Sequence, residues 1–463
     1  MLWHLRGLHS IKPIHYIFSM KQSTIFAIAA ALFASTSAVA QVSYPPAQKG
    51  TTVDEYFGEK VADPYRWLED DMSQQTADWV KAENAVTRKY LNSIPMRANI
   101  LKRLKETVNY EKSGIPFEKN GKWYVHRNNG LQNQYVLYQM DRPDAPTSEQ
   151  RVWLDPNKLS NDGTVALKGV YFSNNGRYMA YVISRNGSDW EEIYVKDCQT
   201  GADTSDHIVW AKFTGATWLG DGFYYSAYDA PEKGREISAK NSVQKIYYHK
   251  MGTPQSADEL FYMNPTQPLR FYGVSVDRDE TAMMLTESGM DNGNNLYVRD
   301  LKKPNSQFIQ MCADTRYQYA PVQTVDGKIY ILTNAGAPKY RLMVADIARP
   351  GFIDWREVVA ESEDVLQDVT FADDRMILKY SKDNCTQLYT YTVDGKRIGE
   401  IKLPTYGTAS ISGKRGSKEV FYDFTSYTIP NSVYRYDLAT GKSTVLFTPN
   451  IKFRTQDYVT EMQ

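Results

Sequence analysis

The sequence predicts a mainly β fold, a seven-bladed β-propeller that follows a short helical segment. Three observations lead to this prediction. From about residue 114, short alternating apolar runs are separated by Gly, Asn and Asp, as in strands joined by turns. One submotif recurs seven times in the same region. The chain also has 34 tyrosines, and aromatic side chains favour strands because they pack well on a pleated surface.

The N-terminus carries a secretory signal. The run "MKQSTIFAIAAALFASTSAVAQ", which starts at Met20, has a basic start, an apolar stretch and small residues before Ala40. It is too short for a membrane span, although a buried N-terminal helix is an alternative. We interpret residues 1–19 as an upstream extension and residues 1–40 together as leader and signal peptide. A periplasmic or secreted protein without membrane contact after cleavage is therefore expected.

Two helices are expected before the repeats. Ser73 is a candidate N-cap for the first, and Asn92-Ser93-Ile94-Pro95 ends it. In each helix, apolar residues three or four positions apart form one face. These residues are Trp79, Ala82, Val86 and Tyr90 in the first helix, and Ile100, Leu101, Leu104 and Val108 in the second.

The repeated submotif begins with an aliphatic residue, which is usually followed by a tyrosine. Two further residues come next, and then often Asp. Its copies begin at Leu137, Ile193, Ile246, Leu296, Leu342, Leu388 and Val433, at spacings of 56 down to 45 residues. Each copy follows another strand-like run with a turn before it, often Asn-Gly or Asp-Gly, which tolerate positive φ. Seven four-strand units of this length predict a propeller, in which neighbouring sheets cover each other. The alternatives are a solenoid and a β-sandwich with linkers, but a sandwich would not repeat one submotif seven times.

The composition excludes some classes of function. Lys plus Arg and Asp plus Glu both number 54, so the net charge is zero, which argues against a nucleic-acid partner. The three cysteines, Cys198, Cys312 and Cys385, are widely spaced and give no disulfide framework. We interpret them as small buried hydrophobic residues rather than as nucleophiles or ligands.

No active site is visible in the residue pattern. A hydrolase nucleophile would lie in G-x-S-x-G, and neither "GVSVD" at Gly273 nor "SISGK" at Ser410 fits this pattern. The residues after 40 hold three histidines, His126, His207 and His249, without metal-ligand spacing to other ligand-type residues. We therefore expect no catalytic residue in this chain, no metal site and no cofactor.

Several sequence blocks resemble the prolyl oligopeptidase family of serine peptidases. The blocks occur in the family's order and extend over nearly all of the chain after residue 40. They are "YPPAQK" at Tyr44, "DPYRWLED" at Asp63, "LSNDGTVAL" at Leu159, "RNGSDWEEI" at Arg185, "VWAKFTGATW" at Val209, "KIYYHKMGT" at Lys245 and "YDFTSYTIP" at Tyr422.

The resemblance implies a domain organisation. In that family a seven-bladed propeller covers an α/β-hydrolase domain that is split in sequence around it. Residues 41–113 would then be the N-terminal helical segment of the split hydrolase domain, and residues 114–450 the propeller. Residues 451–463 would begin the crossover to a catalytic domain that this chain lacks, so the family's Ser, Asp and His have no counterparts here.

The resemblance also implies three substrate-side positions on the propeller. Phe213 matches the phenylalanine of the family's "VKF…AW" block. Phe271 aligns with a position where relatives can have Met, and Met290 with a position where relatives can have Cys. Both depart from the residue associated with the pattern. Packing in the propeller core is the alternative role for all three residues.

The expected function is that of the N-terminal and propeller portion of a prolyl oligopeptidase-type serine endopeptidase. The propeller would restrict access so that short proline-containing peptides are cleaved after proline by a monomeric enzyme, while this chain alone would be inactive. The alternative is a stand-alone, non-catalytic propeller that serves as a binding module. A G-x-S-x-G elbow within ~100 residues beyond Gln463 would distinguish the two.

Overall fold

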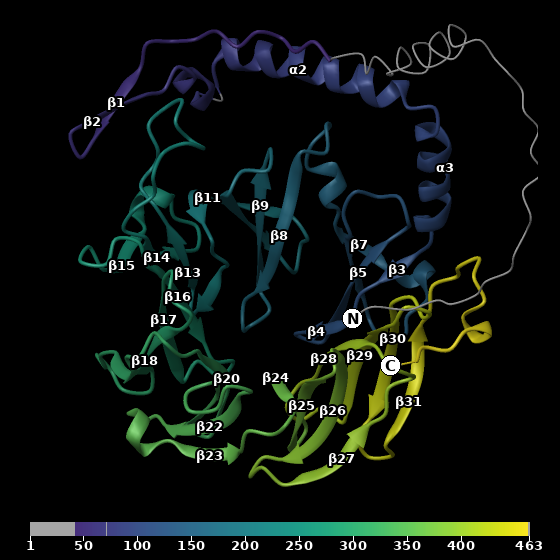
Figure 1. Cartoon of the computed structure of the whole chain (residues 1–463). Coiled ribbons are helices and arrows are strands. Elements are labelled where there is room, and N and C mark those ends of the chain that lie inside the picture. The colour runs from purple at the N-terminus through teal and green to yellow at the C-terminus, as the bar shows by residue number, and fades with distance from the viewer. Residues whose placement is uncertain (1–41, 71, 462–463) are drawn as a thin grey trace, which may run out of the picture. The chain divides into compact units, whose positions relative to one another are not determined.

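A computed structural model describes residues 42–70 and 72–461 (Figure 1). The signal peptide assigned to residues 1–40 lies outside the described residues. The chain divides into two compact units. The described part of the first comprises residues 42–68 and 72–95, and that of the second comprises residues 69–70 and 96–461. The domain boundary drawn after residue 113 stays a prediction.

The first unit contains a β-hairpin and a long helix. Its elements are β1 (Val53–Tyr56), β2 (Glu59–Ala62), the 3-10 helix η1 (Arg66–Glu69), whose last residue is grouped with the second unit, and α2 (Gln74–Ser93). The hairpin turns at Phe57 and Gly58, with φ of 53° and 87°. Two consecutive positive φ values are typical of the tight turns that match strand twist.

The expected N-cap of the first helix is confirmed. The Ser73 hydroxyl accepts a hydrogen bond from the Thr76 N–H at 3.1 Å, which satisfies one free donor of the first turn of α2. Trp79 of α2 packs edge-on against Trp67 at a centroid distance of 6.4 Å. The "DPYRWLED" block therefore joins the helix through a tryptophan pair inside the first unit.

The second unit begins with α3 (Arg97–Val108). The break expected between the two helices is thus confirmed at residues 94–96. The apolar residues expected on one face of α3, Ile100, Leu101, Leu104 and Val108, are all exposed in the structure.

The remaining strands form seven successive antiparallel units, which we call blades 1 to 7 (Figure 1). Blade 1 is β3 (Lys112–Ser113), β4 (Phe117–Lys119), β5 (Lys122–Asn128), β6 (Val136–Met140) and β7 (Arg151–Leu154). Blade 2 is β8 (Val165–Phe172), β9 (Tyr178–Arg185), β10 (Trp190–Asp197) and β11 (Asp203–Lys212). Blade 3 is β12 (Thr217–Leu219), β13 (Gly222–Ala227), β14 (Lys245–Lys250) and β15 (Glu259–Met263).

The other four blades each have four strands. Blade 4 is β16 (Phe271–Val276), β17 (Ala282–Ser288), β18 (Asn294–Asp300) and β19 (Ile309–Cys312). Blade 5 is β20 (Tyr319–Val325), β21 (Lys328–Thr333), β22 (Arg341–Asp346) and β23 (Arg356–Val359). Blade 6 is β24 (Val365–Ala372), β25 (Arg375–Lys382), β26 (Cys385–Thr392) and β27 (Arg397–Ile401). Blade 7 is β28 (Thr408–Ser412), β29 (Glu419–Thr425), β30 (Ser432–Asp437) and β31 (Lys442–Phe447).

Short 3-10 helices lie in several loops of the second unit. They are η2 (Thr147–Glu149), η3 (Pro156–Lys158), η4 (Gln255–Ala257), η5 (Phe352–Asp354) and η6 (Thr455–Asp457). The expected Asn-Gly and Asp-Gly hairpins are present. Asn120-Gly121 and Asp326-Gly327 join the first two paired strands of their blades, with all four φ values between 49° and 76°.

The submotif marks the same place in every blade. Each copy begins in the third main strand, from β6 in blade 1 to β30 in blade 7, and its first aliphatic residue is at most 1% exposed. In five blades the register between the third and fourth strands shifts directly after that residue. A β-bulge there increases the twist of the sheet, which suits blades that stack around an axis.

Consecutive blades share apolar cores. Among the described residues, six hydrophobic clusters each combine buried side chains from two consecutive blades, from blades 1 and 2 to blades 6 and 7. Blades 2 and 3 are further joined by one backbone pair, Ala211 with Ala227, so that their strands form one continuous sheet. The sequence did not predict this join.

Hydrogen bonds to backbone atoms cross the same six junctions. Gln134 of blade 1, for example, donates to the Val165 carbonyl at 2.7 Å and accepts from the Leu167 N–H at 2.8 Å. Asn294 of blade 4 accepts from the Tyr319 N–H at 2.9 Å and donates to its carbonyl at 3.1 Å. Blades 3 and 4, 5 and 6, and 6 and 7 also make such bonds.

The junction between blades 7 and 1 is different. In the described residues it contains side-chain contacts only, and the strands of the two blades belong to separate sheets. Lys414 pairs with Glu118, the Arg435 guanidinium lies 3.9 Å from the Asp144 carboxylate, and Trp123 meets Phe421 edge-on at 5.3 Å. The expectation that "GKWYVHR" and "SVYRYDL" lie in separate sheets without a shared backbone ladder is confirmed.

We expect amide hydrogen exchange to be faster at this junction than at the others. The amides of β4, which is held by its pairing with β5 alone, should exchange at least about tenfold faster than that of Tyr319, which Asn294 holds across the junction of blades 4 and 5, because separating blades 7 and 1 breaks no backbone hydrogen bond between them. Exchange mass spectrometry with short overlapping peptides measures both. Equal protection of β4 and β20 would contradict this expectation.

Candidate functional site

The two ends of the blades carry different connections. Because the strands of a blade are antiparallel, its first turn lies at one end, which we call the turn end. The second turn and the connection to the next blade lie at the other, which we call the connection end. The chain also enters blade 1 at β3 and leaves blade 7 after β31 at the connection end.

All three predicted substrate-side residues lie at the connection end. Phe213 follows β11 in the connection from blade 2 to blade 3, Phe271 opens β16, and Met290 lies in the turn after β17. The structure brings Phe213 and Phe271 together, with ring centroids 5.6 Å apart and ring planes at 81°. Phe213 is 55% exposed and Met290 is 92% exposed, so neither side chain is packed in the core. Their role toward substrate stays a prediction.

Phe213 has an unusual backbone conformation. Its φ is 53°, a left-handed value that costs about 1 kcal/mol or more in a residue other than glycine. Next to it, the Thr214 N–H donates to the Glu191 carboxylate at 3.2 Å, and the Thr214 hydroxyl accepts from the Ser226 N–H at 2.8 Å. These bonds fix the chain on one side of Phe213 and hold the strained residue in place.

The buried side chain of Lys212 makes a cation–π contact with the Phe213 ring. The Lys212 Nζ lies 5.4 Å from the centroid of the Phe213 ring and 4.8 Å from that of Trp190. Cation–π contacts gain strength when the cation is shielded from water, and Lys212 is buried. Sequence analysis missed this support, although Lys212 directly precedes Phe213.

The ionisable groups near the two rings are buried or paired with opposite charges. Burial raises the pKa of the Glu191 carboxyl above its ordinary range, although the bond from the Thr214 N–H acts in the opposite direction. Beside Phe271, the Arg270 guanidinium lies 2.8 Å from the Asp291 carboxylate and 3.4 Å from that of Glu287. Asp291 follows Met290, so this ion pair holds the base of the exposed Met290 turn.

A small cavity adjoins the Phe213 ring. Its volume is about 220 Å³, and Phe213 forms one wall. Its other lining residues are Thr214, Gly215, Thr217, Tyr224, Tyr225, Ser226, Gly273 and Val274. The connection end thus offers an aromatic pair, of which Phe213 is exposed and Phe271 is partly buried, with a small cavity beside Phe213.

Further large apolar side chains are exposed at the connection end. Loops of several blades contribute them, and they include Leu131, Tyr135, Ile237, Leu269, Tyr406 and Tyr427. At the turn end, the first turns of the blades carry polar residues, such as Asn120 and Asp326, although the third turns of blades 5 and 6 expose Phe352, Ile353 and Val393. An end rich in exposed apolar groups is typical of a surface that another domain covers.

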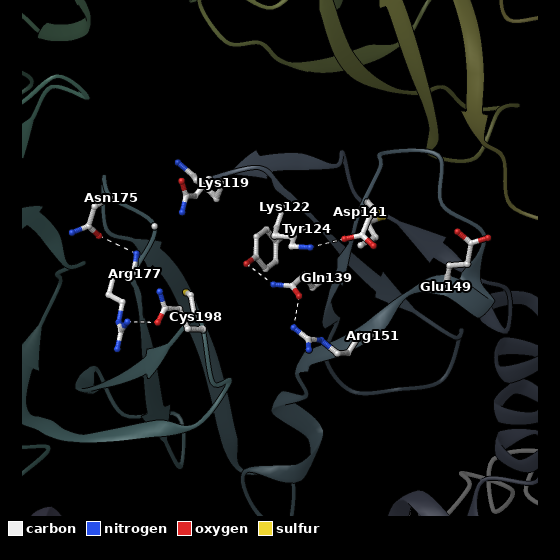
Figure 2. Close-up of a pocket in the computed structure, with 14 residues that line it drawn as sticks. Lys119, Lys122, Tyr124, Gln139, Asp141, Glu149, Arg151, Asn175, Arg177 and Cys198 are labelled. Atoms are coloured by element: carbon white, nitrogen blue, oxygen red, sulfur yellow. Dashed lines mark hydrogen bonds and ion pairs between the residues drawn. The ribbon is translucent and has the colours of Figure 1, made fainter.

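A larger cavity, of about 700 Å³, lies at the turn end between blades 1 and 2 (Figure 2). Its polar groups largely satisfy one another. The Lys122 ammonium lies 2.7 Å from the Asp141 carboxylate, and Gln139 donates to the Tyr124 hydroxyl at 2.8 Å (Figure 2). The cavity contains none of the predicted site residues, and we interpret it as a polar lining between two blades.

Cys198 and Cys312 are not reactive thiols. Of the three cysteines that were expected to be buried, only Cys312 is buried, whereas Cys198 and Cys385 are partly exposed. Burial raises the pKa of the Cys198 thiol, which lines the larger cavity, to about 11 and that of Cys312 to about 12. Both thiols are therefore protonated at neutral pH, where the thiolate would be the reactive form. The described residues contain no group of three or more His, Cys, Asp and Glu side chains that could hold a metal ion.

The structure also reveals a buried cluster around His249. The ring lies between two carboxylates, with Nδ1 2.7 Å from Asp258 Oδ1 and Nε2 3.1 Å from Asp206 Oδ1. Asp206 comes from β11 of blade 2, and the other two residues come from blade 3. No sequence pattern indicates this cluster, because Asp206 is 43 positions from His249.

Comparisons with known proteins place these features in context. Residues 44–449 match the family model for the prolyl oligopeptidase N-terminal beta-propeller domain. A prolyl endopeptidase of Elizabethkingia meningoseptica is 38% identical over 439 residues, which cover 94% of this chain and 61% of the relative. Prolyl oligopeptidase A of Amanita bisporigera is 30% identical over 434 residues, which cover 85% of this chain and 56% of the relative.

Solved structures agree with the sequence comparisons. One from a study of two prolyl endopeptidases has a TM-score of 0.68 and 33% identity, and the match covers 89% of this chain and 60% of that one. Prolyl oligopeptidase B from Galerina marginata, bound to a 35mer hydrolysis and macrocyclization substrate, has a TM-score of 0.77 and 26% identity. That match covers 90% of this chain and 62% of the other. The chain therefore spans about 60% of the length of the relatives it matches.

Proposed function

The chain belongs to the prolyl oligopeptidase family, and from this we propose that it is the N-terminal and propeller portion of a serine endopeptidase that cleaves short peptides after proline. The residues of the propeller supply no nucleophile and base of their own in this proposal. The reaction takes place on a hydrolase portion encoded outside residues 1–463. The relatives are long enough to contain such a portion, since this chain covers 61% of a related prolyl endopeptidase.

One observation carries the proposal. Phe213, Phe271 and Met290 lie at the connection end, where the chain also enters and leaves the propeller. A hydrolase portion attached through the entering and leaving segments would face that end. Its substrate would then lie against the aromatic pair, and exposed residues such as Tyr427 and Leu131 would contribute to the covered surface.

The propeller acts as a filter in this proposal. In it, the ring of stacked sheets encloses the active site and excludes folded proteins, so that only short, flexible proline-containing peptides reach the site. The substrate partner is therefore an oligopeptide. No nucleic-acid partner is proposed, which is consistent with the zero net charge.

We further propose a periplasmic or secreted, monomeric enzyme. The localisation rests on the signal sequence before Ala40. Within the described residues, the structure has no helix with the length and apolar character needed to cross a bilayer. Sedimentation of the mature protein at several concentrations would test the monomer, and cell fractionation would test the localisation.

The reading frame beyond Gln463 distinguishes this proposal from a stand-alone binding module. Sequencing the genomic region should reveal a G-x-S-x-G elbow within about 100 codons, because a hydrolase nucleophile lies on that turn. A stop codon directly after Gln463 in the native gene would overturn the enzyme and favour the binding module.

Replacing Phe213 by alanine should weaken substrate binding in the longer enzyme. We expect KM for a short proline peptide to rise about tenfold, with kcat within about twofold, because an aromatic contact contributes about 1–2 kcal/mol. Phe57→Ala is the matched control, since Phe57 is also exposed and also has a φ of 53°. Equal KM values for the two variants would contradict the substrate-side role of Phe213.

A further inference from the structure

Two buried polar side chains of blade 3 connect the backbones on either side of the aromatic pair. The first is Gln244, which is fully buried just before β14. Its Nε2 donates to the Lys212 carbonyl at 3.2 Å, and its Oε1 accepts from the Tyr272 N–H at 2.7 Å. Lys212 precedes Phe213 and Tyr272 follows Phe271, so one amide group connects the two aromatic positions.

The second side chain is Ser226, in β13. Its N–H donates to the Thr214 hydroxyl at 2.8 Å, and its own hydroxyl donates to the Tyr272 carbonyl at 2.8 Å. Thr214 follows Phe213. Ser226 and Gln244 together therefore hold the residues on both sides of Phe213 and both backbone polar groups of Tyr272.

The backbone near Gln244 is itself strained. Val243 has a φ of 56°, and a left-handed conformation is a clear outlier for a β-branched residue. Its N–H donates to the Pro268 carbonyl at 2.7 Å, in the connection that leads to Phe271. Strain of this kind persists only where the surrounding contacts over-determine it, and it is concentrated at sites that need fixed geometry.

We propose that Gln244 and Ser226 are positioning residues that set the distance and angle between the Phe213 and Phe271 rings. The inference rests on the proposed function in one respect, because it treats the ring pair as a wall of the substrate site. Small displacements of positioned groups reduce the productive binding of substrate. Neither Gln244 nor Ser226 needs to touch the substrate for this effect.

The positioning can be tested in this chain without any activity. A 4-fluorophenylalanine placed at position 213 reports its surroundings through its ¹⁹F chemical shift. Phe271→Ala should move this resonance, because the two rings are in contact. Gln244→Leu should move or split it as well, since it removes both bonds to the Lys212 carbonyl and the Tyr272 N–H.

A matched control separates positioning from general loss of stability. Gln134 makes the same pair of side-chain bonds to backbone atoms, at the junction of blades 1 and 2. Gln134→Leu should destabilise the protein while leaving the ¹⁹F resonance at position 213 unchanged. Ser226→Ala, a milder change that loses only the bond to the Tyr272 carbonyl, serves if Gln244→Leu fails to fold.

Three results would overturn the proposal. A resonance that Phe271→Ala moves but that Gln244→Leu and Ser226→Ala leave in place overturns the positioning role. A resonance that Phe271→Ala fails to move overturns the ring contact and the proposal with it. Movement in both Gln244→Leu and Gln134→Leu overturns the specific role of blade 3.

Kinetics of the longer enzyme then test the link to substrate. Gln244→Leu should raise KM about three- to tenfold, with kcat within about twofold, while Gln134→Leu should change neither, as expected for a lost positioning contact. A moved ¹⁹F resonance with an unchanged KM would overturn the ring pair as a substrate wall, which belongs to the proposed function. It would leave the positioning of the rings intact, so the two failures are distinguishable.

Discussion

The purified chain is expected to release no product from a chromogenic Gly-Pro peptide above the rate in buffer. Acyl transfer needs a nucleophile, a base within hydrogen-bond reach and an oxyanion hole. Among the described residues, the hydrogen bonds of His207 and His249 go to carboxylates and not to a serine hydroxyl. The third histidine, His126, is partly buried, and burial lowers its pKa below the ordinary range.

The size of this effect follows from what a hydrolase portion would add. Removing a serine nucleophile costs a factor on the order of 10⁶ in a comparable peptidase, and the remaining rate comes from an oxyanion hole and substrate binding. Expression of the longer reading frame should therefore restore turnover by at least that factor. A serine-directed phosphonate probe should label the longer protein and leave this chain unlabelled. Hydrolysis by this chain together with covalent labelling of one of its serines would overturn the proposed division of labour.

Replacing His249 by leucine is expected to have the largest effect on stability. The ring is fully buried between Asp206 and Asp258, and its loss would leave two carboxylates buried without their partner. Breaking a buried ionic cluster in this way costs about 3–5 kcal/mol of unfolding free energy. Urea unfolding of both proteins would measure the difference.

His207→Leu is the control for this experiment. The His207 ring is partly exposed and pairs with Glu192 at 2.9 Å, so its loss should cost less than about 1 kcal/mol. Similar costs for the two variants would show that the His249 cluster contributes little beyond a surface pair. Such a result would contradict a structural role at the junction of blades 2 and 3.

The same cluster should make stability depend on pH. Burial lowers the pKa of His249, but the bonds and charges of Asp258 and Asp206 outweigh it and raise the pKa above 6.5. A group whose pKa is raised in the folded state contributes stability that is fully present at pH values below its unfolded-state pKa. This stability is lost as the pH rises through its folded-state pKa. The unfolding free energy of the native protein should thus fall as pH rises above about 6.5, and His249→Leu should lack this decrease.

Asp206 adds a change of opposite sign at low pH. Burial raises its pKa, but bonds from Thr204, the Gly252 N–H and His249 outweigh burial and lower it below 3.8. The stability that Asp206 contributes is present at pH values above its unfolded-state pKa and is lost as the pH falls through its folded-state pKa. The remaining groups that face the cluster are the Tyr225 hydroxyl, which donates to Asp258 at 2.7 Å, and Gln255, which lies 3.4 Å from that hydroxyl.

The repeat architecture could be predicted because its signals are local. The aliphatic residue of the submotif, such as Leu137 or Val433, is buried in every blade, and its hydrophobic character is visible in the sequence. Asn120-Gly121 and Ser73 likewise act within a few residues of themselves. A period of about 50 residues then requires only that similar units stack.

The site could be predicted only in part, because its contacts are long-range. Family resemblance located Phe213, but its support by Gln244 and Ser226 joins residues 12 to 46 positions apart in sequence. No spacing rule connects a glutamine before β14 to the carbonyl at the end of β11, which is three strands earlier. The His249 cluster was missed for the same reason, as was the backbone pair that merges blades 2 and 3.

The side-chain junction between blades 7 and 1 has a consequence for how the protein folds. Among the described residues, strands pair only with near neighbours in the sequence, so none of these strands waits for a partner some 300 residues away, as a shared closing strand would require. Each blade can pair its own strands independently of the others and then stack on the blade that precedes it in the sequence. Closure of the ring becomes a final docking of preformed sheets, and unpaired strand edges are exposed only briefly to aggregation.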